Sequence, residues 1–208
     1  MKHSPYKIVR MFEEEVSRYT GSPFAVALDS CTNALFLCCK YLGVDKVTIP
    51  SQTYLSVPMS IIHAGGEVIF DKSPQANLWR GIYQLKPYPI YDSAKRLTSK
   101  MYIENTFMCL SFHIKKQLGI GKGGMILTDN QDAAEWFKKA RYEGRSEKFY
   151  KEDDIDMLGW NMYMTPQIAA HGLALMQNYP EHNKDSEEEN GYRDLTEFSV
   201  FRKCKVAL

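Results

Sequence analysis

The chain has 208 residues, of which 44% are hydrophobic and 25% are charged, as is typical of a globular rather than a disordered protein. This length is enough for one hydrophobic core, or for one domain with a small appendage. The 26 Lys and Arg residues almost balance the 25 Asp and Glu residues, so the net charge of +1 gives no general argument for binding nucleic acid or an anionic membrane.

The cysteines and the N-terminal residues give evidence on the cellular compartment of the protein. Five cysteines form no C-x-x-C pair, and an odd number without a disulfide framework favours a reducing environment. No apolar stretch approaches the length of a membrane span, and the first residues do not follow a signal-peptide pattern. We therefore expect a cytoplasmic protein. The five histidines lack zinc-ligand spacing, and we expect no metal site.

The first elements are a helix and a strand–turn–helix unit. Apolar residues recur at helical spacing over residues 8–19, and an apolar run at 24–28 predicts a strand that leads into a helical run at 34–43. The first N–H groups of a helix lack internal partners and favour an anion, and Ser30 and Thr32 add hydroxyl donors there. The turn is therefore either a phosphate site or a plain N-cap.

Two further strand candidates, residues 46–50 and 67–71, flank a helical run. The turn after the first of them carries Tyr54, which taken alone is best explained as a core residue. Only about twenty residues then separate Asp71 from Asp92, and prolines just before the next strand discourage a helix there. Because a parallel crossover needs about a dozen residues or more, usually helical, we predict a trimmed sheet with one βα unit deleted or reduced to an extended link.

The next strand candidate ends at Asp92, and Lys95 follows three positions later. A carboxylate at the end of a buried strand is costly unless it has a partner, which indicates either a ligand contact or an N-cap for the next segment. Two apolar runs, 107–110 and 125–128, then bracket a loop that is rich in glycine and lysine. Such a loop suits a lysine used in chemistry, and it also fits a solvated hairpin with basic side chains.

Taken in order, these motifs resemble the DegT/DnrJ/EryC1/StrS group of sugar aminotransferases, which use pyridoxal phosphate (PLP) on a type I aminotransferase fold. The run Ser-Phe-His-x-x-Lys that begins at Ser111, followed by Gly123-Gly124, resembles the family loop that carries the PLP-binding lysine. The matching lysine is Lys116 rather than its neighbour Lys115. Around Ser30, the turn resembles the family's S-G-T phosphate turn, with Cys31 in place of the glycine.

The resemblance implies two catalytic residues. Lys116 would hold PLP covalently and later move the proton, and Asp92 would keep the pyridine nitrogen of PLP protonated. In a G-x-N motif, Asn161 would reach the PLP phosphate of the neighbouring subunit, although Tyr163 replaces the arginine that follows in the family. The implied cofactor-binding residues are Ser30, Cys31, Thr32, Tyr54, Asp92, Lys95, Ser111, Lys116 and Asn161.

The fold implied by the resemblance is α/β: a reduced type I PLP-dependent aminotransferase fold with three α/β/α layers, a mostly parallel sheet and a C-terminal domain that is largely missing. We expect a PLP-binding domain over residues 1–177, with the trimmed crossover at 72–89. Residues 178–208, rich in Pro, Asn, Glu and Lys, are expected to form a short surface segment and tail.

The implied function is transfer of an amino group from an amino acid, frequently glutamate, to a nucleotide-linked keto sugar. The implied assembly is a homodimer with shared active sites. No nucleic acid or membrane is expected as a partner. The alternative is a non-catalytic or PLP-binding scaffold derived from this family. The residues do not identify the sugar, the carbon that is aminated or the amino donor.

Overall fold

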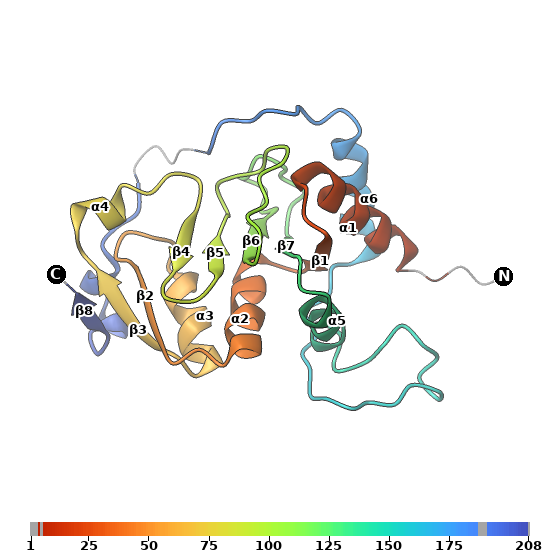
Figure 1. The fold of residues 1–208 in the computed structure, drawn as a ribbon, viewed down its shortest axis with the longest axis horizontal. Helices are drawn as coiled ribbons and strands as arrows, with labels where there is room; N and C mark the ends of the chain where they lie inside the picture. The colour runs from red at the N-terminus through yellow and green to blue at the C-terminus, as the bar shows by residue number, and fades with distance from the viewer. Residues whose placement is uncertain (1–3, 5, 187–190, 208) are drawn as a thin grey trace.

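The computed structural model describes residues 4, 6–186 and 191–207 (Figure 1). Its strands are β1 (Phe24–Leu28), β2 (Lys46–Pro50), β3 (Glu67–Asp71), β4 (Tyr83–Leu85), β5 (Ile90–Asp92), β6 (Phe107–Ser111), β7 (Gly124–Thr128) and β8 (Lys205–Ala207). The helices are α1 (Lys7–Thr20), α2 (Cys31–Leu42), α3 (Ser56–Ala64), α4 (Pro74–Asn77), α5 (Gln131–Ala140) and α6 (Pro166–Met176), followed by the 3-10 turns η1 (Leu195–Glu197) and η2 (Ser199–Phe201). The described helices are too short or too polar to span a lipid bilayer.

The strands form a larger sheet, in the order β1-β7-β6-β5-β4, and a smaller one, in the order β2-β3-β8. Strand β7 is antiparallel to β1 and β6, and β4 is antiparallel to β5, whereas β5 pairs parallel with β6. An antiparallel bridge between Thr48 and Lys86 joins β2 to the end of β4. Among the described strands, all but β4 and β7 therefore run in one direction, and the predicted mostly parallel sheet is confirmed.

Helices cover both faces of the larger sheet, because its central strands are apolar on both sides. In β6, Phe107 and Cys109 lie in one hydrophobic cluster with α2 and α5, and Met108 and Leu110 lie in the other with α1 and α6. This alternation is the two-residue period of a strand. Figure 1 shows α1 and α6 packed together near β1, away from α2 and α3. The predicted three-layer α/β/α architecture is confirmed.

Residues 72–89 contain more structure than the extended link that the sequence suggested. They form the single-turn helix α4 and the strand β4, which folds back as a hairpin against β5. The two prolines of the connection, Pro87 and Pro89, prevent a helix but suit a tight turn. Tyr83 and Leu85 are buried, so β4 also contributes apolar side chains to the core. The prediction of a deleted or merely extended unit is wrong in this respect.

The C-terminal segment is not the surface tail that its polar composition suggested. Leu195 and Phe201 are each 2% exposed and belong to the main hydrophobic cluster. Strand β8 pairs parallel with β3, whose backbone would otherwise form an open sheet edge. Of this segment, residues 187–190 and 208 lie outside the described residues. The division of the chain at residue 177 stays a prediction.

Candidate functional site

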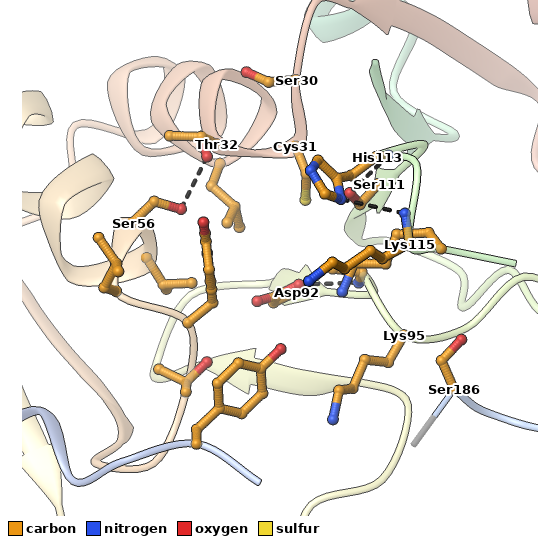
Figure 2. A pocket seen from close by; sticks show the side chains of 18 of the residues that line it. Ser30, Cys31, Thr32, Ser56, Asp92, Lys95, Ser111, His113, Lys115 and Ser186 are labelled. Atoms are coloured by element: carbon orange, nitrogen blue, oxygen red, sulfur yellow. Dashed lines mark hydrogen bonds between the residues drawn. The ribbon is translucent and has the colours of Figure 1, made fainter. Parts of the chain in front are cut away.

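A cavity of about 940 Å³ lies where several chain segments leave the sheet (Figure 2). Because β1, β2, β5 and β6 run in the same direction, the segments that follow their carboxyl ends meet at one edge of the sheet. All but one of the predicted cofactor-binding residues line this cavity. They are Ser30, Cys31, Thr32, Tyr54, Asp92, Lys95, Ser111 and Lys116.

Asp92 is the buried acidic group of the cavity, with 5% of its surface exposed. Its Oδ2 accepts a hydrogen bond from the hydroxyl of Tyr83 at 3.0 Å, and its Oδ1 accepts one from the backbone N–H of Ala94 at 3.0 Å. Burial raises the pKa of Asp92, while these two donors and the positive charges of Lys116 and Lys95 act in the opposite direction. The carboxyl group thus lies within electrostatic reach of both lysines.

The loop between β6 and β7 contributes three lysines to the lining of the cavity, and two of them are adjacent. A hydrogen bond joins the two ends of the loop: the N–H of Phe112 donates to the carbonyl of Gly123 at 2.9 Å. Within it, the N–H of Lys116 donates to the carbonyl of His113 at 2.8 Å, which closes a turn. Lys115 is exposed and Lys116 is half-buried, and of the two it is Lys116 whose charge acts on Asp92. This arrangement favours Lys116 as the functional lysine.

The N-terminus of α2 faces the same cavity. The Ser30 side chain caps the helix by accepting the N–H of Asn33 at 3.2 Å, and the Thr32 hydroxyl lies 2.8 Å from that of Ser56. Cys31 stands in place of the family's glycine, and its Sγ contacts the carbonyl of Cys109 at 3.5 Å, so the side chain points toward β6. The first amides of α2 therefore keep the geometry of an anion site.

One glycine lets β7 approach this turn. A Cβ atom built on Gly124 would lie 2.3 Å from the carbonyl carbon of Ser30, far inside van der Waals contact. Only glycine fits between the lysine loop and the start of α2, and it thereby fixes the distance between these two parts of the cavity.

Aromatic side chains form one wall of the cavity, and the sequence motifs had identified only Tyr54 among them. Trp79 and Tyr192 stack with their ring centroids 5.9 Å apart, and the ring of Tyr54 lies 6.4 Å from that of Tyr192. The Lys95 ammonium lies 5.1 Å from the Trp79 centroid and 4.8 Å from the Tyr192 centroid. Lys95 is thus held over an aromatic pair as well as near Asp92.

Sequence reasoning missed two aromatic residues that line the cavity, Trp79 and Tyr192, and it also missed Tyr83, which contacts Asp92 from outside the cavity lining. They lie in the shortened crossover and in the C-terminal segment, where no motif was recognised. The one available signal was the alternation of Tyr83 and Leu85 with polar neighbours, which is the pattern of a half-buried strand.

Asn161 is the predicted cofactor-binding residue that the structure does not bring to this cavity. It is exposed, and its side-chain amide donates to Glu143 Oε1 at 3.1 Å. Its backbone forms a bridge with Tyr142, beyond α5. The predicted contact of Asn161 is with the PLP phosphate in the neighbouring subunit. A single chain does not contain that contact, so the role of Asn161 across the interface stays a proposal.

The sequence model of the DegT/DnrJ/EryC1/StrS aminotransferase family matches residues 2–76 and 101–195, which is most of the chain. The chain belongs to the DegT/DnrJ/EryC1/StrS aminotransferase family. The family match leaves out residues 77–100, which hold Tyr83, Asp92 and Lys95. Asp92 and Lys95 line the cavity and Tyr83 donates a hydrogen bond to Asp92, so their position in the structure is the main argument for a functional role.

Curated relatives in this family include the spore coat polysaccharide biosynthesis protein SpsC of Bacillus subtilis, 24% identical over 86% of this chain and 59% of its own length. UDP-4-amino-4,6-dideoxy-N-acetyl-beta-L-altrosamine transaminase of Campylobacter jejuni is 24% identical over 88% of this chain and 60% of its own length. Spr1654 of Streptococcus pneumoniae, solved in a PLP form, superposes with a TM-score of 0.67 at 20% identity, over 83% of this chain and 59% of that one. The chain thus spans about 60% of the length of these relatives.

Proposed function

We propose that this chain binds PLP and transfers an amino group from an amino acid to a nucleotide-linked keto sugar. The observation that carries the proposal is the convergence of Lys116, Asp92 and the N-terminus of α2 on one cavity. Membership in a family of aminotransferases supports the reaction class. The name of the Campylobacter relative, a UDP-sugar transaminase, supports the substrate class.

The residues present fit PLP, because each part of that molecule has a matching partner. Asp92 offers a buried carboxylate to the pyridine nitrogen, and the amides and hydroxyls at the start of α2 offer donors to the phosphate. Tyr54 offers a flat ring beside the flat ring of the cofactor. When bound, PLP would supply an electron sink that stabilises negative charge on the substrate carbon.

Two side chains of this site would act on protons. Asp92 would hold a proton on the pyridine nitrogen, since a carboxylate stabilises the cationic form of a neighbouring base. The amine of Lys116, once released by the incoming amino group, would take a proton from one carbon atom and return it to another. An amine accepts a proton only in its neutral form, so the role of Lys116 depends on its environment in the cavity.

A second candidate function is a PLP-binding scaffold without catalysis. It is favoured by the position of Asn161 outside the cavity. A scaffold of this kind would bind the cofactor but would not exchange amino groups with an amino acid.

The experiment that separates these functions is spectroscopic. Purified protein loaded with PLP is expected to show a visible absorption band, and adding glutamate is expected to remove that band while 2-oxoglutarate forms in stoichiometric amount. A panel of amino acids tests other donors in the same way. A band that persists with every amino acid, without formation of any keto acid, would establish the scaffold instead.

The proposal includes a homodimer in which Asn161 serves the partner's site, and mixed subunits test it. Lys116→Ala chains and Asn161→Asp chains are expected to be inactive separately, because the first lacks the amine and the second places a negative charge near phosphate. In a mixed dimer, one site carries both changes and the other carries neither. We expect each heterodimer to regain about half of the wild-type activity.

Refolding the two variants together, with different affinity tags, isolates the heterodimer for this assay. Activity that stays absent in verified heterodimers would mean that each site is built within one chain. Asn161 would then have no role across the interface.

A further inference from the structure

Strand β4 places a tyrosine directly opposite the buried carboxyl group of the site. In the register of the hairpin, Tyr83 pairs with Asp92, and directly opposed residues of antiparallel strands project from the same face. The Tyr83 hydroxyl consequently reaches Asp92 Oδ2 at 3.0 Å. The Tyr83 ring packs against Trp79, with the centroids 4.8 Å apart, so its position is fixed from both sides.

A second hydroxyl extends this contact. Thr53 Oγ1 lies 2.6 Å from the Tyr83 hydroxyl, and both residues are buried, with 2% and 8% of their surfaces exposed. An ionised carboxylate only accepts hydrogen bonds, so Tyr83 donates to Asp92 and accepts from Thr53. Burial and the nearby negative charge raise the pKa of Tyr83 well above its usual value, which keeps its hydroxyl protonated and able to donate.

We propose that Tyr83 is a positioning residue for Asp92, and that the chain from Thr53 through Tyr83 to Asp92 keeps this carboxyl group ionised and aimed at the pyridine nitrogen of PLP. The inference rests on the proposed function. Tyr83 lies in the stretch that the family match leaves out, on the antiparallel strand that occupies the shortened crossover. The hairpin therefore supplies a functional side chain as well as filling the sheet.

The geometry explains what the hydroxyl contributes. Oδ1 of Asp92 is held by the N–H of Ala94 and Oδ2 by Tyr83, so the carboxyl plane cannot rotate. Each oxygen has a second lone pair, which leaves an acceptor position for the cofactor. Without the Tyr83 hydroxyl, the buried carboxylate loses a hydrogen-bond donor and its charged form becomes less favourable.

The sign of the pH effect follows from the groups around Asp92. Lys116 and Lys95 are cations that favour its ionised form, whereas the thiols of Cys31 and Cys109 are neutral because burial raises their pKa values well above the usual value. Asp92 is protonated as the pH falls through its raised pKa. Removing the Tyr83 hydroxyl raises this pKa further, so ionisation is lost at a higher pH.

The test compares Tyr83→Phe with wild type and with Tyr88→Phe. Tyr88 belongs to the same hairpin, but its hydroxyl accepts the backbone N–H of Asp45, outside the cavity. Carbon-13 NMR titration of the Asp92 carboxyl group in the cofactor-free protein is expected to show a pKa about one unit higher in Tyr83→Phe, and unchanged in Tyr88→Phe. In the PLP-loaded protein, Tyr83→Phe is expected to slow half-transamination with glutamate about tenfold. The acidic limb of the pH–rate profile is expected to move to higher pH, in the same direction as the Asp92 pKa.

Thr53→Val keeps the branched shape at that position, removes the first hydroxyl of the chain and leaves the Tyr83 ring in place. It is expected to shift the Asp92 pKa in the same direction by a smaller amount, and it carries the test if Tyr83→Phe does not fold. An Asp92 pKa that is equal in wild type and the folded variants would overturn the inference. A shifted Asp92 pKa without a shift in the acidic limb of the pH–rate profile would also overturn it. Failure of wild-type protein to bind PLP would instead refute the proposed function, and the cofactor-free titration distinguishes the two failures.

Discussion

Lys116→Ala is expected to abolish covalent PLP binding and to lower the rate of amino transfer by about 10³-fold or more. The expectation follows from the position of Lys116, which lines the cavity, is half-buried and lies within electrostatic reach of Asp92. Alanine removes both the amine that would bond to PLP and the group that would carry the proton. The measurement is the visible absorption of PLP-loaded protein, combined with single-turnover formation of 2-oxoglutarate.

Lys115→Ala is the matched control, because it removes a neighbouring amine of the same loop that also lines the cavity. It is expected to keep the absorption band and most of the activity, since Lys115 is exposed. Borohydride reduction of wild-type protein with bound PLP, followed by peptide mapping, identifies the modified lysine directly. Modification of Lys115 would show that the loop had been aligned one residue out of place.

Asp92→Asn is expected to leave the fold and PLP binding largely intact and to slow half-transamination by about 10²–10³-fold. An asparagine side chain has nearly the same shape. Its amide oxygen can still accept the N–H of Ala94, and its NH2 group can donate to the Tyr83 hydroxyl in place of the bond that Tyr83 now donates. What it lacks is the negative charge that holds a proton on the pyridine nitrogen. The ring would then be a poorer electron sink, and stopped-flow absorbance with glutamate measures the loss.

Asp71→Asn provides the control for this substitution. Asp71 also ends a strand, and its carboxylate accepts the N–H of Ser73, but it does not line the cofactor cavity. Its variant is expected to turn over at nearly the wild-type rate. Unchanged half-transamination in Asp92→Asn would remove Asp92 from the site and would leave the pyridine nitrogen without an acidic partner.

The hairpin of β4 and β5 carries Asp92, one of the two predicted catalytic residues. The chain spans about 60% of the length of its relatives, and the family match is interrupted at residues 77–100. In the structure this stretch is well packed, with Tyr83, Leu85 and Ile90 buried, and it carries Asp92 to the cavity. The hairpin therefore holds both the strand-end carboxylate of Asp92 and the tyrosine that donates a hydrogen bond to it.

The sequence alone was sufficient for features that depend on neighbouring residues. The strand, polar turn and helix around Ser30 formed as expected, because a serine N-cap and an apolar run are local signals. The loop that contains Lys116 lies between two buried strands, as its flanking apolar runs predicted. Since strand ends on one sheet edge converge, eight of the nine predicted cofactor-binding residues line one cavity.

Tertiary structure decided the features that depend on which distant segments meet. The polar composition after residue 178 gave no sign that Leu195 would be buried beside Ser51, or that β8 would pair with β3. Hydrophobic burial is not directional, and an open strand edge accepts any segment with free backbone groups. No local motif therefore predicts the burial of Leu195 or the pairing of β8 with β3. The same holds for Tyr83, whose contact with Asp92 exists only because the hairpin pairs in one register, and a slip of one residue would turn its side chain to the other face.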